Sequence, residues 1–360
     1  MPRIITVTSG KGGVGKTNIS VNLALQLATR GYRTCLFDAD MGLANINILL
    51  GIYPEVNLAH VINGEKTLSD IIIHNYMGID IVPGGTGISK LANLQAEQIE
   101  PILTEFKMLD DYDFVIFDTS AGAGGDVTAF CRAASQMLLI ITPEPTSLTD
   151  AYSLLKILSA QGFTKHVLVA VNQARHLQHA KIPYLSLSRT VAKHLPLKIS
   201  AIGFITQDAH VTEAVRLQKP FISLYPKAMA SICIRKIAER LISGKVSDHS
   251  LTDMKTFWSE YLGLRDPVEK QPKPQQAESS PLPVSNTSPA GLEPVLNEIA
   301  HSLSAISVQL GAIRQLMELR LKRKAPSVAH QHPATDNSQA IPILLDFENF
   351  LKEKQNGGTP

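Results

Sequence analysis

The sequence predicts an α/β fold in which helices cover both faces of a doubly wound, mostly parallel sheet. Up to about residue 244 of the 360, short β-rich runs alternate with longer helical patterns. Most of these runs are continuously apolar, as expected for parallel strands buried on both faces. A hydrophobic fraction of 44% is enough for a substantial core. The predicted strands are residues 4–8, 34–37, 79–82, 114–117, 138–141, 167–171 and 201–205.

The first predicted strand runs directly into a phosphate-binding loop. Residues 10–17, Gly-Lys-Gly-Gly-Val-Gly-Lys-Thr, fit the pattern G-x-x-x-x-G-K-[ST]. Glycines let successive backbone N–H groups converge on phosphate oxygens, and the helix that follows adds its positive N-terminal end. Apolar residues at helical spacing over 17–29 predict that helix, which stops before Gly31. A glycine-rich turn that happens to carry lysines is the alternative, and the strand–loop–helix setting argues against it.

Each residue type in the loop has an expected role. Lys16 is expected to neutralise the β- and γ-phosphates of a nucleoside triphosphate, and the Thr17 hydroxyl to bind Mg²⁺. Lys11, directly after the first glycine, is an addition to the ordinary motif. The nucleotide contacts expected from this segment are Gly10, Lys11, Gly12, Gly13, Val14, Gly15, Lys16, Thr17 and Asn18.

Carboxylates follow two further strands. Asp38 and Asp40 come at the end of the strand 34–37, and Asp118 directly follows the strand 114–117. Because residues i and i+2 of a strand point the same way, Asp38 and Asp40 are expected to face the crevice where such sheets bind ligands. An ordinary acidic turn is the alternative. Asp118 suits an acidic group near Mg²⁺, and the glycine-rich loop 122–125 after it can respond to a γ-phosphate.

Two later strand ends complete the predicted nucleotide site. Asn172 follows the strand 167–171, and Asp208 lies in Thr-Gln-Asp-Ala-His at residues 206–210. The guanine-reading pattern Asn-Lys-x-Asp does not occur in the sequence. The sequence therefore favours ATP over GTP.

Composition argues against several classes of protein. A net charge of +2 and a pI near 8.3 give no bulk electrostatic case for nucleic-acid binding. Cys35, Cys131 and Cys233 form no C-x-x-C pair and are expected to be small buried side chains in a reducing cytoplasm. The N-terminus is already the first strand, so no signal peptide is expected, and no apolar run is long enough to span a membrane.

Beyond the last predicted helix of this domain, residues 227–242, the composition changes. Residues 266–290 and 325–340 are rich in polar residues and proline and predict disordered linkers. Between them lies a heptad seam of about three repeats, which leaves a docked amphipathic helix and a self-associating or partner-binding coiled coil both open. The seam consists of Leu296, Ile299, Leu303, Ile306, Leu310, Ile313 and Met317.

Residues 251–264 place apolar side chains, including Trp258, near one helical face. A membrane-surface helix, packing on the core and a partner contact are the alternatives, and the basic face expected on anionic lipid is missing. The predicted organisation is an ATPase domain over 1–244, an amphipathic segment for membrane or partner contact over 245–265, a Pro-rich linker over 266–290, an amphipathic or coiled-coil helix over 291–324, and a tail over 325–360 with a short hydrophobic docking motif at 341–351.

With its early lysine, the loop resembles the deviant Walker A motif of the MinD/ParA ATPases, and the resemblance covers roughly residues 1–244. It implies the MinD-like fold of the SIMIBI class of P-loop NTPases and a homodimer with ATP sandwiched between its subunits. It also implies that Lys11 reaches the phosphates bound by the partner, that Lys16 binds phosphate, and that Asp40 positions the attacking water.

The same resemblance implies the remaining site residues. Thr17, Asp38 and Asp118 would hold or support Mg²⁺. Asn172 would contact adenine, with Asp208 as a second candidate.

Four stretches, residues 38–51, 57–66, 69–72 and 142–152, are similar to the FlhG/FleN flagellar-number regulators, more than to septum-placing MinD or plasmid ParA. That family implies slow, partner-stimulated ATP hydrolysis and a cytoplasmic protein that associates peripherally with the inner face of the cell membrane, including at a pole. It implies action on the polar GTPase FlhF, on switch-complex proteins or on a flagellar transcriptional activator. Many members carry an N-terminal extension that activates FlhF. Here the first strand begins at once, so activation by that route is not expected.

Two alternatives stay open within the same fold. One is an ATPase that positions another cargo, such as the division site or chromosomal or plasmid DNA. For DNA it has one local group of basic residues, namely Arg216, Lys219, Lys227, Arg235, Lys236 and Arg240. The other is a cluster-carrying relative, to which Cys131 alone would offer two ligands per dimer where a cluster needs four.

Overall fold

The computed structural model describes residues 1–263 except 41–44, 86, 92–93, 95 and 245–251. The predicted linkers, the heptad helix 291–324 and the tail 325–360 lie outside the described residues.

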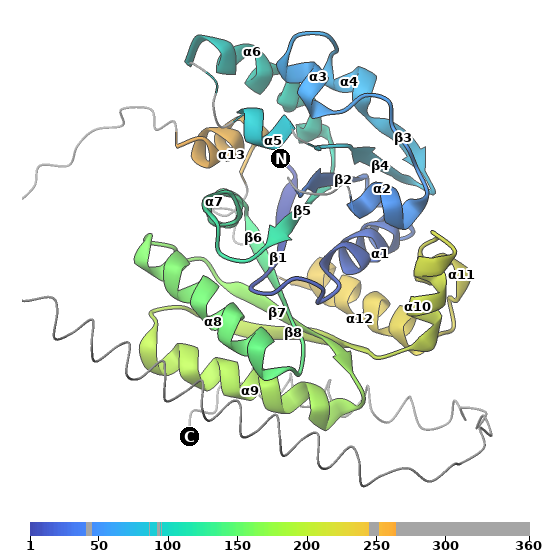
Figure 1. The fold of residues 1–360 in the computed structure, drawn as a ribbon, viewed down its shortest axis with the longest axis vertical. Helices are drawn as coiled ribbons and strands as arrows, with labels where there is room; N and C mark the ends of the chain where they lie inside the picture. Colours follow the sequence, from blue (N-terminus) through green and yellow to red (C-terminus); the bar gives the residue numbers. More distant parts are fainter. Residues whose placement is uncertain (41–44, 86, 92–93, 95, 245–251, 264–360) are drawn as a thin grey trace, which may run out of the picture. The chain divides into compact units, whose positions relative to one another are not determined.

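An eight-stranded sheet forms the centre of the described chain, in the order β3-β4-β2-β5-β1-β6-β7-β8 (Figure 1). All neighbouring strands pair in parallel except β3 and β4, which are antiparallel. The strands are β1 (Arg3–Ser9), β2 (Thr34–Ala39), β3 (Ile73–Tyr76), β4 (Ile79–Val82), β5 (Phe114–Ala121), β6 (Gln136–Ile141), β7 (Val167–Ala174) and β8 (Ile199–Thr206). The seven predicted strands and the doubly wound fold are confirmed.

The prediction missed β3, because its sequence Ile-His-Asn-Tyr is half exposed at the sheet edge and lacks a continuous apolar run.

The helices are α1 (Lys16–Ala28), α2 (Asn45–Leu50), α3 (Leu58–Ile62), α4 (Leu68–Ile71), α5 (Gly87–Leu91), α6 (Ala96–Phe106), α7 (Gly125–Ala133), α8 (Pro145–Ala160), α9 (Leu177–His194), α10 (Ala209–Arg216), α11 (Phe221–Leu224), α12 (Met229–Ser243) and α13 (Met254–Tyr261), with a 3₁₀ turn η1 at Lys107–Asp111.

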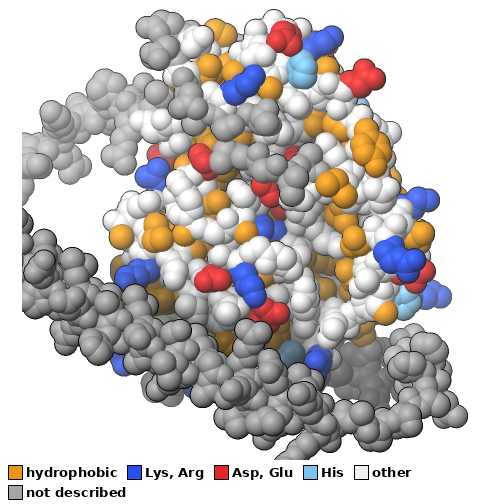
Figure 2. Space-filling model, viewed as in Figure 1, with side chains coloured by type: hydrophobic (Ala, Val, Ile, Leu, Met, Phe, Trp, Pro, Cys, Tyr) orange, Lys and Arg blue, Asp and Glu red, His pale blue; other side chains and the backbone are white. Residues whose placement is uncertain are grey.

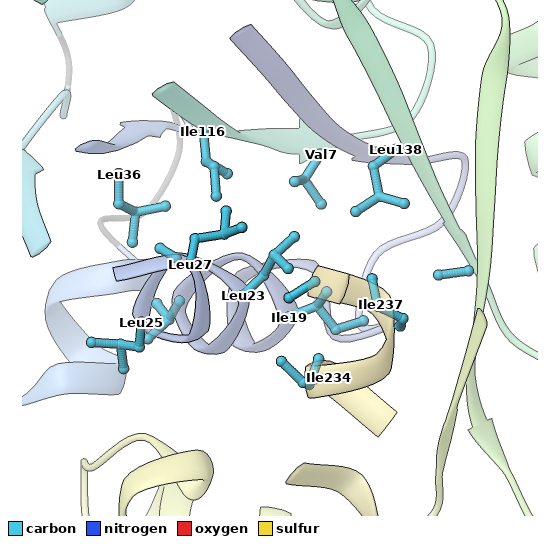
Figure 3. Packing of buried hydrophobic residues seen from close by; sticks show 14 of the residues in the cluster. Val7, Ile19, Leu23, Leu25, Leu27, Leu36, Ile116, Leu138, Ile234 and Ile237 are labelled. Atoms are coloured by element: carbon cyan, nitrogen blue, oxygen red, sulfur yellow. The ribbon is translucent and has the colours of Figure 1, made fainter. Parts of the chain in front are cut away.

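Alternation along the central strands divides the core between the two faces of the sheet. In β2 and β5, Leu36 and Ile116 pack on the side of α1 and α12, whereas Phe37 and Phe117 pack on the opposite side. Figure 3 shows the first side, with Leu23 and Leu27 of α1 against the strands. Both faces are therefore apolar and covered, and the polar ends of the strands are left for the site.

Helix α13 packs on the face of the sheet opposite α1. Met254, Phe257 and Trp258 are fully buried and Tyr261 is 6% exposed. The Trp258 ring stacks on Phe106 with centroids 4.4 Å apart, and the Phe257 ring stacks on Phe117 at 4.5 Å. The apolar face of α13 is thus used by the core.

This packing corrects the prediction of a membrane or partner contact over 245–265, as far as the described helix α13 is concerned. Burial of the aromatic face of α13 stabilises the domain more than its exposure to water would, because each large aromatic side chain removes its apolar surface from water. The α/β domain accordingly extends past residue 244 to include α13. None of the helices in the described ranges is long and apolar enough to cross a membrane.

Replacing Trp258 with Ala should lower the free energy of unfolding by about 3–5 kcal/mol, because it leaves a large cavity against Phe106. Urea denaturation followed by circular dichroism measures the change. Trp258→Phe is the matched control and should cost far less, since it keeps a stacked ring and removes an indole N–H that has no hydrogen-bond partner among the described residues. Equal stability of Trp258→Ala and wild type would contradict the packing of α13.

Candidate functional site

The phosphate-binding loop lies where β1 ends, between its sheet neighbours β5 and β6. β1 ends at Ser9 and α1 begins at Lys16, so the loop is short. Gly15 caps α1 with φ 93°, a left-handed conformation that favours glycine. At Gly10, a Cβ would come within 2.4 Å of the backbone of Asp150 and Ala151 in α8, so this glycine is required for close packing. The loop is therefore held on its outer side by α8 and on its inner side by the start of α1.

Lys16 lines a cavity of about 650 Å³ beside the phosphate-binding loop. Its side chain is mostly buried, and burial lowers the pKa of its ammonium group, while the charges of Asp118 and Asp40 act in the opposite direction. Gly12, Gly13, Gly15, Thr17 and Asn18 line the same cavity. The structure thus brings most of the predicted loop residues to one place; Gly10, Lys11 and Val14 are outside the lining.

Asp38 and Asp118 lie side by side at the ends of two adjacent strands. They are paired in the parallel register of β2 and β5, and both are fully buried. Burial raises the pKa of Asp38 well above its usual range, and the neighbouring charge of Asp118 raises it further. Burial also raises the pKa of Asp118 to about 6, against the hydroxyl groups of Thr17 and Ser20 and the charge of Lys16, which lower it. The Ser20 hydroxyl donates to Asp118 Oδ1 at 2.9 Å.

One oxygen of each carboxylate, Asp38 Oδ2 and Asp118 Oδ2, is buried without a hydrogen-bond partner among the described residues. Buried polar atoms are nearly always paired, so two orphaned carboxylate oxygens beside a phosphate loop fit a divalent cation. The described residues contain no group of three or more His, Cys, Asp or Glu that could hold a metal by themselves. Mg²⁺ suits this arrangement, because it is usually held by one or two carboxylates together with phosphates of the substrate and water.

Asp40, two residues beyond Asp38, lines the same cavity as Lys16, and its charge acts on the Lys16 ammonium group. The Asn45 side-chain amide donates to Asp40 Oδ2 at 2.8 Å, which orients the carboxylate. The two predicted carboxylates differ in burial, since Asp38 is buried beside Asp118 while Asp40 is partly exposed and lines the cavity. Residues 41–44 between Asp40 and Asn45 are outside the described residues.

Lys11 does not line the cavity and is held by a different pair of residues. Its Nζ lies 2.6 Å from Glu144 Oε2 and 2.9 Å from Thr146 Oγ1, both at the start of α8. The side chain of Lys11 is 36% exposed and that of Glu144 is 58% exposed, so water screens this ion pair. An ion pair of this kind contributes less than about 1 kcal/mol, and Lys11 can exchange it for another partner at little cost.

Sequence reasoning did not identify Glu144 as a site residue. The signal was available, because Glu144 follows the apolar strand β6 in Thr-Pro-Glu-Pro, and β6 is the sheet neighbour of β1. Side chains after neighbouring parallel strands meet at the same edge of a sheet. Sequence reasoning also missed the far wall of the cavity, which consists of Asn45, Ile48, Leu49, Ala121, Val215, Arg216 and Gln218.

The two residues expected at adenine have different surroundings. The Asn172 side-chain amide donates to the Val14 carbonyl at 2.7 Å and so holds the phosphate loop, and Asn172 is not among the residues that line the cavity. Asp208 instead caps α10. Its Oδ1 accepts from the His210 backbone N–H at 3.0 Å and its Oδ2 from the Ala230 N–H at 3.2 Å. Because its two oxygens accept from backbone N–H groups of α10 and α12, Asp208 joins these helices, and it is not among the residues that line the cavity.

The structure gives little support to the two alternative functions, a cluster-carrying protein and an ATPase that binds DNA. Cys131 is fully buried in α7, and burial raises the pKa of its thiol, so it offers no thiolate at the surface. Within the basic group, Arg235 donates to the Pro226 carbonyl at 2.7 Å, Arg240 to the Ile202 carbonyl at 2.8 Å, and Lys236 pairs with Glu239 at 3.4 Å. Half of that group is thus engaged within the protein.

A doubly wound sheet, a phosphate loop with an additional lysine and carboxylates at the ends of β2 and β5 define a P-loop ATPase of the MinD/ParA type. A family model described as "AAA domain" matches residues 2–166. The chain is 38% identical to the antiactivator FleN of Pseudomonas aeruginosa, over 67% of this chain and 86% of that protein. It is 32% identical to the flagellum site-determining protein YlxH of Helicobacter pylori, over 67% of this chain and 82% of that protein. The chain belongs to the FlhG/FleN family within the MinD/ParA ATPases.

Solved structures agree with this assignment. The MinD chain in the MinC:MinD cell division protein complex of Aquifex aeolicus superposes with a TM-score of 0.55 at 26% identity, covering 68% of this chain and 98% of that chain.

Replacing Asp118 with Asn should stabilise the nucleotide-free protein at pH 7.5 by about 1–3 kcal/mol, because a charged buried carboxylate is costly and the amide is neutral. The folded-state pKa lies above the unfolded value, so the folded state binds more protons and this cost disappears as the pH falls from about 6 toward 4. The stability difference between variant and wild type should therefore shrink over that range.

Thermal unfolding at several pH values measures this difference. Asp111→Asn, at an exposed aspartate in η1, is the control and should leave stability nearly unchanged. Stabilisation by Mg²⁺ and ATP should be lost only in Asp118→Asn. If Asp118→Asn is less stable than wild type at pH 7.5, the charged Asp118 carboxylate does not destabilise the folded protein and the prediction is wrong.

Proposed function

We propose that this protein is an ATP-dependent dimerisation switch that regulates flagellar number and placement and hydrolyses ATP slowly. The flagellar part is supported by membership of the FlhG/FleN family and by the relative named flagellum site-determining protein YlxH, at 32% identity. The observation that supports the switch is the position of Lys11, outside the cavity and on a weak, exposed ion pair with Glu144. A lysine needed only for phosphates bound in its own subunit would be expected to line that cavity.

The chemistry of the site follows from its charges. Lys16 would bind the β- and γ-phosphates, and Thr17, supported by Asp38 and Asp118, would hold Mg²⁺. Mg²⁺ would supply neutralisation of the phosphate charge. Asp40, oriented by Asn45, would accept a hydrogen bond from the attacking water and hold it in line. Lys11 would supply additional positive charge for the transition state by acting on the phosphates bound by the partner subunit.

Under this proposal the monomer and the dimer differ in the partner of Lys11. Lys11 pairs with Glu144 in the monomer, and in the dimer it would pair with phosphate oxygens across the interface. Because the exposed ion pair is weak, a triphosphate with several negative charges can compete for the lysine. The nucleotide then shifts the monomer–dimer equilibrium by its differential affinity for the two states.

The output of the switch would be contact with a flagellar partner. We propose FlhF, a switch-complex protein or a flagellar transcriptional activator, at the inner face of the cell membrane or a cell pole. Nucleic acid is the less favoured partner, because the net charge is only +2 and half of the basic group is engaged internally.

Lys11→Ala should bind ATP with an affinity within about threefold of wild type but fail to dimerise, since it loses only the interaction across the interface. Asp40→Ala should accumulate as an ATP-bound dimer, because it binds but does not position water. Size-exclusion chromatography with light scattering in ATP and Mg²⁺ measures both. Lys156→Ala, at an exposed lysine of α8, is the matched control and should dimerise as wild type. An Asp40→Ala variant that stays monomeric, or a Lys11→Ala variant that dimerises equally well, would refute the sandwich mechanism.

Cells that lack this protein should show an increased number or altered position of flagella, counted by electron microscopy. Complementation with wild type should restore the count, and Lys11→Ala should not, because its switch cannot close. Normal flagellation in the deletion strain would overturn the flagellar role and leave the ATPase switch unaffected.

A further inference from the structure

Helix α1 buries the side chain of Asn22 in an apolar part of the core. Asn22 has no exposed surface, and Ile19 and Leu23 beside it belong to the core that α1 shares with the sheet and α12 (Figure 3). Asparagine is a poor helix former, and burying its amide is costly unless the polar atoms are paired. The hydrogen bonds of Asn22 therefore have to explain why it stands here.

Both polar atoms of the Asn22 side chain are paired. Its Nδ2 donates to the Asn18 carbonyl at 2.7 Å and to Asn18 Oδ1 at 3.1 Å. Its Oδ1 accepts from the backbone N–H of Ile222 at 2.9 Å. Asn22 thus joins the first turn of α1 to the short helix α11.

The backbone partners determine how both amides are oriented. A backbone N–H can only donate and a backbone carbonyl can only accept, so the Oδ1 of Asn22 must face Ile222 and its Nδ2 must face Asn18. The second hydrogen of that Nδ2 is then donated to the Asn18 side chain, which must present its oxygen. The Nδ2 of Asn18 is left on the side away from Asn22.

Asn18 belongs to the nucleotide cavity. It lines the cavity together with Lys16 and Thr17, directly after them in α1. Among the residues that the structure describes, no hydrogen bond from Asn18 Nδ2 is found. The buried amide of Asn22 therefore fixes a donor at the cavity surface.

The contact with Ile222 reaches a second part of the cavity lining. Val215, Arg216 and Gln218 line the cavity at the end of α10 and in the turn that leads into α11. Charged and hydrophobic side chains lie over α10 and α11 on the surface (Figure 2), whereas the bond from Asn22 lies in the interior. One side chain thus spans the first turn of α1 and the segment that follows this lining.

We propose that Asn22 is a positioning residue for the nucleotide, and that it holds the Asn18 side-chain amide as a donor to an oxygen of the α-phosphate. Lys16 would bind the β- and γ-phosphates and Thr17 the Mg²⁺, so the α-phosphate remains for the next residue of α1. A hydrogen bond to a charged phosphate oxygen is among the stronger kinds. The inference rests on nucleotide binding, as in the proposed function, and is independent of dimerisation.

A purely structural role of Asn22 would not require this arrangement. Anchoring α11 needs only the acceptor Oδ1, and a single backbone acceptor satisfies the buried donor. The second hydrogen of Nδ2 is instead used on the side chain of Asn18, a residue of the cavity lining. That bond orders the Asn18 side chain before a ligand arrives, so less conformational entropy is lost on binding.

The test measures the dissociation constant of ADP with Mg²⁺ by isothermal titration calorimetry on the full-length chain. ADP carries the α-phosphate, and its binding does not require the dimer. We expect Asn18→Ala to raise the constant about tenfold, because a hydrogen bond to a charged group is lost. Asn22→Leu should raise it at least about fivefold. The double variant should match Asn18→Ala alone, since Asn22 acts on the ligand only through Asn18.

Ser231→Ala is the matched control for the anchoring of α11. The Ser231 hydroxyl is fully buried and donates to the Tyr225 carbonyl at 2.8 Å and to the Phe221 carbonyl at 3.4 Å. It holds α11 from α12 and has no bond to Asn18. Ser231→Ala should lower the melting temperature and leave the affinity for ADP within about twofold of wild type.

Asn22→Ser separates positioning from folding. Its hydroxyl can donate to the Asn18 carbonyl, as serine does within helices, so the variant should fold. A hydroxyl has one proton, which leaves none for Asn18 Oδ1, so the affinity for ADP should still fall about as far as in Asn22→Leu.

The affinity for ATP should fall by the same factor as that for ADP, because both carry the α-phosphate. A loss confined to ATP would refute the α-phosphate as the acceptor. Wild-type affinity in Asn22→Ser, additive losses in the double variant, or an equal loss in Ser231→Ala would overturn the positioning role while ATP binding stands. A wild-type chain that binds neither nucleotide would overturn the proposed function, and this inference with it.

Discussion

The structure depends on two carboxylates buried next to each other where β2 and β5 end. Asp38 and Asp118 share a register position, and neither has more than part of its charge compensated by the protein. Lys16 and the Ser20 hydroxyl, both from the first turns of α1, supply the compensation that exists. The position of α1 across the sheet is therefore an electrostatic requirement as well as a packing result. A site built in this way holds more negative charge than is favourable until a cation arrives.

The opposite face of the same strands explains how such a site is tolerated. Phe37 precedes Asp38 and Phe117 precedes Asp118, and both rings lie in a cluster with Trp258. Alternation along a strand sends each aromatic ring to one face and leaves the carboxylate at the next position. The apolar side chains of α13 thus pack on the residues that directly precede the buried carboxylates Asp38 and Asp118. Loss of α13 would weaken the support of the site as well as the general stability of the domain.

Much of the fold and of the candidate site was predictable from the sequence. The residues that were missed or misplaced each have a physical reason. The phosphate loop, Asp38, Asp40 and Asp118 follow from local patterns whose chemistry is specific, and the structure brings them together. The role of Glu144 was missed because its partner Lys11 is 133 residues away in the sequence, and only the adjacency of β1 and β6 joins them. Asp208 was placed at adenine from its position after a strand. Its carboxylate also accepts hydrogen bonds from backbone N–H groups of α10 and α12, which no local pattern shows.

The amphipathic segment at 251–264 illustrates a related limit. An apolar helical face is equally compatible with lipid, a partner or the domain's own core, because hydrophobic burial has no direction. What decided between them was the space under α6, α7 and η1, which is a property of the assembled fold. The same ambiguity applies to the heptad seam at 296–317, which lies outside the described residues.

The burial of Trp258 has a practical consequence, since it is the only tryptophan in the chain. Its indole ring is buried and stacked on Phe106. It also packs against Phe37, the residue that directly precedes Asp38 in β2. All tryptophan fluorescence of the protein therefore comes from this single ring, and its emission reports the environment between α13 and the sheet. The chain carries its own optical probe of the layer behind the nucleotide site, without any label.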